Sequence, residues 1–264
     1  TRRLRARVEG LEVLEGRVEA VRLSHSDVLK LVTPRFVNAA GPFQGQVANM
    51  LGVELPVYHE LHEKVVFNDH LKVLPREAPL LIWIDHQSLD WNEQERLFLA
   101  ESDDTSALLE RFPPGVHLRP EGMGASTTLL MLWNYHTQRR QPVFPIEHDP
   151  LYPEVLLRGM ATMLPGLRAY YKRMPRPQLD GGYYTKTREN RPLIGPLPVE
   201  GAYLIGALSG FGVMASAAAG ELLAAHITGG VLPEYAPAFS LERYQDPQYL
   251  DLLAGLDRSA EIEL

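Results

Sequence analysis

A glycine-punctuated turn that opens an alanine-rich helix is the segment of this chain best suited to bind a ligand. The segment runs from Gly206 to Gly229 and reads GALSGFGVMASAAAGELLAAHITG. Residues 203–207 predict a buried strand that leads into the turn at 209–212. The first N–H groups of a helix lack partners inside it and lie at the positive end of the helix dipole. The turn therefore predicts either a site for a phosphate or a ring carbonyl, or a close-packed helix with a glycine hinge.

A second turn of small residues follows the strand expected at 35–38. The sequence there is FVNAAGPF, with Ala39, Ala40 and Gly41 directly after the strand. A strand end of this kind is usually only structural. Small side chains also leave room for the backbone to lie against a nucleotide, so both interpretations stay open.

Histidines and glutamates cluster in YHELHEK, which contains His59, Glu60, His62 and Glu63. A zinc-protease helix needs histidines four residues apart with a glutamate between them. Here the histidines are three apart in a segment typical of a strand, so they point to opposite faces. We predict a solvated strand face and no metal site.

Serine hydrolase and P-loop chemistry find no matching motif. Ser209 lies in LSGFG and Ser216 in ASAAAG, so neither sits in the G-x-S-x-G turn of a serine hydrolase. The lysine-containing phosphate loop of nucleotide triphosphatases does not occur either. The two glycine turns are therefore the features that a function must explain.

The elements that position these turns change in character twice along the chain. Residues 4–8 read as the end of a helix, and strands are expected at 11–14, 17–23, 28–33 and 35–38, with a short helix at 44–52. After Pro56 come strands with polar faces at 57–69, 79–85, 115–122 and 127–136, and helices at 91–102, 104–112 and 151–167. Residues 181–196 read as a loop before the last strand, turn and helix. This pattern predicts a discontinuous α/β domain with an inserted antiparallel α+β domain.

Composition and charge exclude several classes of function. The 264 residues are 45% hydrophobic and 22% charged, and a net charge of -7 gives no basic footprint for nucleic acid or an anionic membrane. The sequence has no cysteine, which excludes disulfides, thiolate metal sites and cysteinyl-linked cofactors. The most apolar run, 211–227, contains Glu221 and falls short of a membrane span. No secretory signal follows the basic residues 1–5, and we expect a cytoplasmic protein.

Six stretches occur in an order and spacing that are together specific: GRVEAVRL, FVNAAGPF, GVHLRPEG, TRENRPLIGP, GAYLIGALSGFGVMASAAAGELLAAHITGG and LPEYAPAFSLERY. In that order they resemble the FAD-dependent amine and amino-acid oxidase family, which includes D-amino-acid, glycine and sarcosine oxidases. The likeness is greatest to an FAD-dependent oxidoreductase subgroup that includes a mitochondrial complex I assembly factor. It implies a discontinuous, Rossmann-like FAD-binding domain at 1–57 and 182–264. It also implies an inserted antiparallel-sheet substrate domain at 58–181, with a helical insertion near 86–112.

The resemblance implies a role in FAD binding for each matched segment. Val18 would contact the adenine side through its backbone. Ala39, Ala40 and Gly41 would pass beside the diphosphate or ribityl chain, with Phe43 where the family often has tryptophan. Residues at the glycine turn would direct backbone N–H groups at the pyrimidine carbonyl of the flavin, where they stabilise the negative charge of the reduced ring: Gly206, Gly210, Phe211, Gly212, Val213 and Met214.

One motif of the family is not found in this sequence. In relatives, a G-x-G-x-x-G strand, turn and helix precedes all of the matched segments, with a ribose-binding acid about 20 residues later. We therefore expect the chain to be the C-terminal part of a longer flavoprotein that binds FAD poorly alone. The N-terminal half of the site would lie on the same polypeptide or on a separate chain.

The resemblance also bears on the substrate. Relatives hold the substrate carboxylate with an arginine that precedes the segment matching RPLIGP. The corresponding residue here is Tyr184, which donates one hydrogen bond but forms no bidentate ion pair, so Lys186 or an arginine from elsewhere would have to compensate. Tyr184 and Lys186 are the predicted substrate-binding residues.

The reaction that the family implies is oxidation of a C–N bond in a small-molecule amine or amino acid, by hydride transfer to FAD. The reduced flavin would be reoxidised by oxygen or a quinone. A flavoprotein scaffold or assembly factor with structural FAD is the alternative, and a glycine-hinged binding module without flavin is a third. Likeness of fold alone does not separate them.

Overall fold

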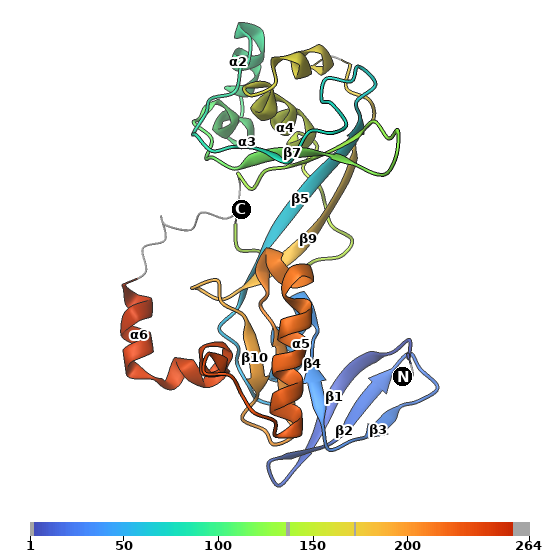
Figure 1. Cartoon of the computed structure of the whole chain (residues 1–264), viewed down its shortest axis with the longest axis vertical. Helices are drawn as coiled ribbons and strands as arrows, with labels where there is room; N and C mark the ends of the chain where they lie inside the picture. The colour runs from blue at the N-terminus through green and yellow to red at the C-terminus, as the bar shows by residue number, and fades with distance from the viewer. Residues whose placement is uncertain (1–2, 136–137, 172, 256–264) are drawn as a thin grey trace. The chain divides into compact units, whose positions relative to one another are not determined.

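The computed structural model describes residues 3–135, 138–171 and 173–255. These residues form two compact units, which Figure 1 traces in colour along the chain. The first unit contains residues 3–60, 139–142 and 183–255, and the second contains the remaining described residues. The divisions at 60/61 and 182/183 lie next to the boundaries expected at 57/58 and 181/182, and the segment 139–142 is an unexpected addition to the first unit.

An antiparallel sheet of three strands opens the first unit. Its strands are β1 (Arg7–Leu14), β2 (Arg17–Ser24) and β3 (Lys30–Val32), in the order β1-β2-β3. The helix end predicted at 4–8 is wrong, because Arg7 and Val8 pair with β2 and belong to β1. Pairing with a neighbouring strand outweighs the weak local preference of a short segment.

A second sheet in the first unit contains the pair of parallel strands. Strand β4 (Phe36–Asn38) runs parallel to β11 (Ala202–Gly206), and β10 (Leu193–Pro196) runs antiparallel on the other side of β11. In this register Phe36 lies beside Ala202 and Asn38 beside Leu204. The carboxyl ends of β4 and β11 therefore meet at one edge, where ligands of open α/β sheets bind.

Helices extend from both parallel strands. The turn η1 (Gly41–Phe43) and the helix α1 (Gln44–Asn49) follow β4, and η4 (Ser209–Phe211) and α5 (Gly212–Thr228) follow β11. Helix α5 lies along β10 and β11, as Figure 1 shows. The remaining elements of the first unit are η5 (Ala236–Phe239), η6 (Leu241–Gln245) and α6 (Pro247–Ala254). Two cores hold these elements together, one around Val18, Ala48 and Leu204 and one around Leu222 and Leu223.

Helix α5 is apolar around most of its circumference. Within the described residues, Ser209–Thr228 has a mean hydropathy of 1.3 and is long enough to cross a membrane, with 17% of the segment buried. This is weak support for a membrane span, since the core helix of a globular protein passes the same test. A helix without a polar face is usually covered by other protein, so the exposed part of α5 needs an explanation.

The second unit is a sheet covered by helices. The sheet has the order β6-β7-β8-β5-β9, with β5 (Tyr58–Asn68), β6 (Leu81–Trp83), β7 (Val116–Glu121), β8 (Thr128–Leu132) and β9 (Gln178–Lys186). The pairs β5–β8, β6–β7 and β7–β8 are antiparallel. The first residues of β5 and the last of β9 belong to the first unit. The expectation of a loop at 181–196 is wrong, because these residues supply the end of β9 and all of β10.

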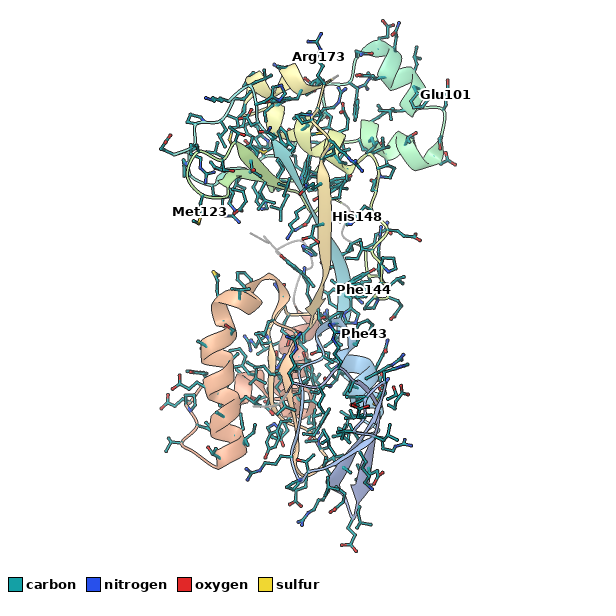
Figure 2. The ribbon with its side chains drawn as sticks, turned by 90° about the vertical axis from the view of Figure 1, so that its right-hand side faces the viewer. Phe43, Glu101, Met123, Phe144, His148 and Arg173 are labelled. Carbon is teal, nitrogen blue, oxygen red and sulfur yellow. The ribbon has the colours of Figure 1, made fainter. Side chains whose placement is uncertain are left out.

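The helices of the second unit are α2 (Glu93–Leu99), α3 (Asp103–Ser106), α4 (Tyr152–Ala161) and the turns η2 (Ala107–Leu109) and η3 (Pro165–Tyr170). Helix α4 is the centre of the core, with Val155, Leu156 and Met160 fully buried. The glycines predicted to join β7 and β8 adopt positive φ at Gly122 and Gly124. Met123 between them, labelled in Figure 2, is 91% exposed. An antiparallel sheet with helices confirms the predicted fold class for this part of the chain.

Candidate flavin site

The carboxyl ends of β4 and β11 form one edge lined by small residues. Asn38 is buried at the end of β4, where its Nδ2 donates to the carbonyl of Gln44 at 2.8 Å and its Oδ1 accepts from the N–H of Ala40 at 3.2 Å. These two bonds fix the turn that contains Ala39, Ala40 and Gly41. Gly41 has a φ of 55°, which a side chain rarely tolerates. The edge therefore presents a rigid backbone with almost no side chain.

The turn between β11 and α5 is strained at residues other than its glycines. Ala207 and Ser209 have φ values of 52° and 51°. This left-handed conformation costs a residue with a side chain about 1–3 kcal/mol, and in this chain it also occurs at Glu15, His25, Lys72 and Asn190. Gly212 instead has a helical φ of -52°. The glycines of the turn thus serve to make space.

Two of these glycines are required by side chains distant in sequence. A Cβ on Gly206 would overlap Oε1 of Gln44, and a Cβ on Gly210 would lie 2.7 Å from the ring of Tyr184. The nearest atom to a Cβ on Gly212 is 3.7 Å away, an ordinary contact, and it belongs to Leu208. Nothing in the described chain therefore requires glycine at 212, and the space beside it is open to a ligand.

The contact with Gly210 brings Tyr184 to the start of α5. Tyr184 lies on β9 and is half-buried, and its ring packs against the backbone of the turn. The sequence predicted both residues as site residues from separate segments. The structure brings them together within the first unit.

Lys186 lies two residues further along β9 and is only 1% exposed. Its Nζ forms an ion pair with Oε2 of Glu60 at 2.6 Å. Next to this pair, His59 Nδ1 lies 3.0 Å from the hydroxyl of Thr185. Burial lowers the pKa of His59. Lys186 thus carries a charge that Glu60 already neutralises, and its proposed contact with substrate stays a prediction.

The solvated strand face predicted for YHELHEK is wrong. Glu60, His62 and Glu63 are all less than a tenth exposed, and His59 is half-buried. Partners distant in sequence cover them. Oε1 of Glu63 lies 2.6 Å from Nδ1 of His148, and Glu60 forms an ion pair with Lys186. The described residues contain no group of three or more metal-ligating side chains.

Other predicted cofactor-binding residues lie at different places in the first unit. Val18 is fully buried, and its N–H donates to the carbonyl of Glu200 at 2.9 Å, near the start of β11. It therefore lies beyond the opposite end of β11 from the glycine turn. Phe43, labelled in Figure 2, is 37% exposed in η1 beside the small-residue turn. A contact of Val18 or Phe43 with FAD stays a prediction.

The end of η4 and the first turn of α5 expose apolar side chains. Phe211, Val213 and Met214 are 45%, 91% and 79% exposed. Among the residues that the structure describes, no side chain caps the N-terminal N–H groups of α5. The start of α5 thus combines open space at Gly212 with backbone N–H groups at the positive end of the helix dipole, and a contact of this turn with the flavin stays a prediction.

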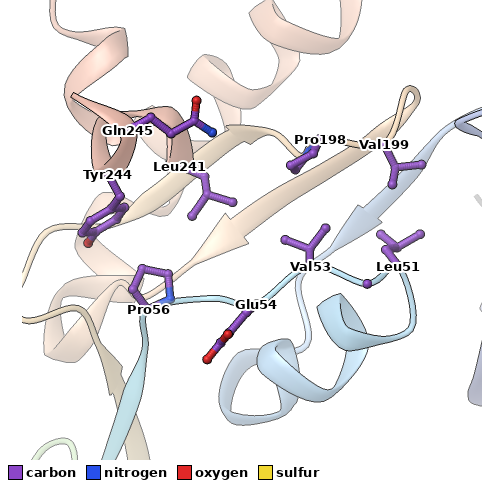
Figure 3. A pocket seen from close by; sticks show the side chains of 10 residues that line it. Leu51, Val53, Glu54, Pro56, Pro198, Val199, Leu241, Tyr244 and Gln245 are labelled. Carbon is purple, nitrogen blue, oxygen red and sulfur yellow. The ribbon is translucent and has the colours of Figure 1, made fainter. Parts of the chain in front are cut away.

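The groove in Figure 3 lies elsewhere. It has a volume of about 540 Å³ and separates the segment after α1 from η6, with walls made by Leu51, Gly52, Val53, Glu54, Pro56, Pro198, Val199, Leu241, Tyr244 and Gln245. None of the predicted site residues lines it. We therefore place the candidate site at the strand edge and not in this groove.

Two features of the site were not apparent in the sequence. Gln44 and Glu60 are both buried beside predicted site residues, and neither belongs to a motif. The first lies next to Gly206 and the second holds Lys186. Asn38 differs from these two residues, because a polar residue at the end of the buried strand in FVNAAGPF is visible in the sequence.

The chain matches the family model described as FAD dependent oxidoreductase over residues 2–226. It therefore belongs to this family, which confirms the resemblance seen in the sequence. The family implies FAD as the cofactor and an oxidoreductase as the general class of protein.

Solved structures with the same fold agree with this assignment. L-proline dehydrogenase from P. horikoshii has a TM-score of 0.61 at 16% identity, covering 91% of this chain and 54% of that one. Glycine oxidase from Bacillus cereus ATCC 14579 has a TM-score of 0.59 at 14% identity, covering 88% of this chain and 52% of that one. Iminodiacetate oxidase from Chelativorans sp. BNC1 has a TM-score of 0.57 at 14% identity, covering 88% of this chain and 51% of that one.

At these identities the likeness shows the fold. The chain spans about half the length of each of these structures. Among curated proteins, no sequence match reaches significance.

Proposed function

We propose that this chain forms the flavin-ring side of the FAD site in an oxidoreductase that oxidises a C–N bond of an amine or amino acid. The observation that carries the proposal is the shared edge of β4 and β11, onto which Tyr184 of β9 packs at Gly210. Bound FAD would supply the oxidising ring that accepts a hydride from the substrate carbon next to nitrogen. The substrate would leave as an imine, which water hydrolyses.

Different residues at this edge would bind different parts of FAD. The first N–H groups of α5 would hold the pyrimidine carbonyl and favour the reduced ring, whose negative charge they stabilise. Ala39, Ala40 and Gly41 would let the backbone approach the diphosphate or ribityl chain. The positive φ of Ala207 and Ser209 is consistent with this assignment, since strained backbone is often found at ligand sites.

The charge at the substrate-facing side favours an amine over an amino acid. Lys186 is neutralised by Glu60 inside the first unit, which leaves Tyr184 as a neutral hydrogen-bond donor. A substrate carboxylate would bind weakly to such a group compared with an arginine. The three structural neighbours are named for proline, glycine and iminodiacetate, so we include amino acids in the test.

We also propose that an N-terminal dinucleotide-binding half completes the site, on the same polypeptide or on a separate chain. Two observations support this. The apolar side chains of Phe211, Val213 and Met214 are exposed at the start of α5, and the chain covers about half of each similar structure. Such a partner would cover the apolar helix and hold the adenine end of FAD.

Steady-state oxidation by the full-length protein, on a panel of primary, secondary and tertiary amines and amino acids, tests the proposed function. Tyr184→Phe is expected to lower kcat/KM for the best substrate about ten- to a hundredfold. The reason is the loss of one hydrogen bond to the reacting substrate, worth about 1–3 kcal/mol.

Tyr183→Phe is the matched control, because successive residues of a strand point to opposite faces. It is expected to keep the wild-type kcat/KM. Small and equal effects of the two substitutions would remove Tyr184 from the site. Absence of turnover with every compound, in a protein that holds FAD, would favour a structural flavin.

A further inference from the structure

Gln44, the first residue of α1, has a side chain without hydrogen-bond partners in the described structure. It is 0% exposed, and neither Nε2 nor Oε1 of its amide has a partner. The backbone of Gln44 is fixed separately, since its carbonyl accepts from Asn38 Nδ2 at 2.8 Å. The hydrogen bond of the backbone carbonyl is therefore satisfied, and it is the side-chain amide that lacks partners.

A buried amide without partners is unfavourable for the fold. Each unsatisfied donor or acceptor costs free energy that a methylene or methyl group of the same shape would not. Folded proteins pair nearly all such groups, and an exception calls for an explanation such as strain, a functional role or a bound species that completes the group. The Gln44 amide thus lowers the stability of the fold, which is expected of a side chain whose role is to bind a ligand.

The position of the amide indicates which site it serves. Its Oε1 lies against Gly206, at the carboxyl end of β11, in the space that a Cβ of residue 206 would fill. The strained turn and the uncapped N-terminus of α5 follow directly after Gly206. Gln44 thus reaches the strand edge from β4 at the point where the turn after β11 begins.

We propose that the Gln44 amide turns out of this position to bind the cofactor, with its Nε2 donating and its Oε1 accepting. The inference rests on the proposed function and assigns one more contact to the same site. An amide with both atoms unpaired needs a ligand group that carries an N–H or O–H donor beside an acceptor. The imide edge of the flavin ring and the hydroxyls of the ribityl chain have this chemistry. An ionised diphosphate offers acceptors only and would leave Oε1 unpaired.

Gln44→Met tests the proposal in the full-length protein, because methionine has a similar shape and no polar atoms. The expected result is an FAD dissociation constant about tenfold higher, from the loss of up to two hydrogen bonds. The flavin-free variant is expected to unfold at a denaturant midpoint equal to or above that of the wild type. Gln46→Met is the matched control, since Gln46 is exposed on the same helix and is expected to change neither quantity.

Two FAD analogues identify the group that Gln44 contacts. The wild type is expected to bind either N3-methyl-FAD or 2′-deoxy-FAD more weakly than FAD, and Gln44→Met is expected to lose that discrimination. A variant that binds FAD as well as the wild type would overturn the inference and leave the proposed function standing. A lower denaturant midpoint with unchanged affinity would do the same, by making the amide structural. A wild-type protein that binds no FAD would overturn both.

Discussion

Gly212→Val in the full-length protein is expected to leave the fold intact and to weaken FAD binding about ten- to a hundredfold. Gly212 has a helical φ of -52°, and the nearest atom to an added Cβ is 3.7 Å away. The chain itself therefore accommodates a side chain at this position. Crowding a close-packed contact with extra carbon atoms costs about 1–3 kcal/mol, which corresponds to the expected change in the dissociation constant.

Gly220→Val is the control for this substitution. Gly220 lies on the same helix and is exposed, and an added Cβ would have no atom within 4 Å. Both variants place the same side chain on α5, at its first residue and in its interior, so denaturant unfolding of the flavin-free proteins separates a change in helix stability from a change in FAD affinity. Titration of each flavin-free protein with FAD measures the effect. Equal affinities of the two variants would show that no ring lies beside the start of α5.

Arg243→Met is expected to lower the free energy of unfolding by about 3–5 kcal/mol, because it breaks a buried ion pair and leaves a carboxylate without its partner. Arg243 lies in η6, and its Nη2 is 2.6 Å from Oε1 of Glu189. The guanidinium also donates to the carbonyls of Arg191 and Pro192, while Tyr244 and Tyr249 donate to the same Oε1. These bonds attach η6 and α6 to the turn between β9 and β10. Denaturant unfolding measures the loss.

The same pair makes stability depend on pH. Burial alone would raise the pKa of Glu189, but hydrogen bonds from Tyr244 and Arg243 lower it below its usual value of 4.5. A carboxyl whose pKa is lower in the folded state stabilises the fold above the usual value, and this contribution is lost as the pH falls through the folded-state pKa. Wild-type stability should therefore decrease below pH 4.5. Glu189→Gln should show a flatter profile in this range, and an unchanged profile would remove Glu189 as its source.

The strands, the helix α5 and the small-residue turns were predictable because local pattern specifies them. Short β-type runs bounded by glycine mark β2, β4 and β11, and the alanine-rich run after the glycine turn marks α5, without knowledge of their partners. The reason for each glycine was not predictable. Gly206 makes room for Gln44 and Gly210 for Tyr184, and both contacts join residues far apart in the chain. The positive φ values occur at Ala207 and Ser209, and neither residue type favours this conformation.

The burial of the charged residues was not predictable either, because their partners are also distant in the sequence. Glu60 reads as part of a polar strand until Lys186 is placed beside it, 126 positions later in the chain. The strand at 7–8 and the end of β9 were also missed, because pairing with a neighbouring strand decides them and not their own composition. The sequence thus predicts the candidate site as two turns. In the structure the strands before these turns end at one edge, where Gln44 lies against Gly206 and Tyr184 against Gly210.

Anaerobic addition of substrate to the purified, FAD-loaded full-length protein tests whether the bound flavin oxidises an amine. We expect an amine or amino acid to bleach the visible absorbance of the oxidised flavin, and oxygen or a quinone to restore it. The bleaching should be slower in Tyr184→Phe than in Tyr183→Phe. A flavin that stays oxidised with every compound of the panel, although it is bound in stoichiometric amount, would contradict the proposed oxidation and make the cofactor structural.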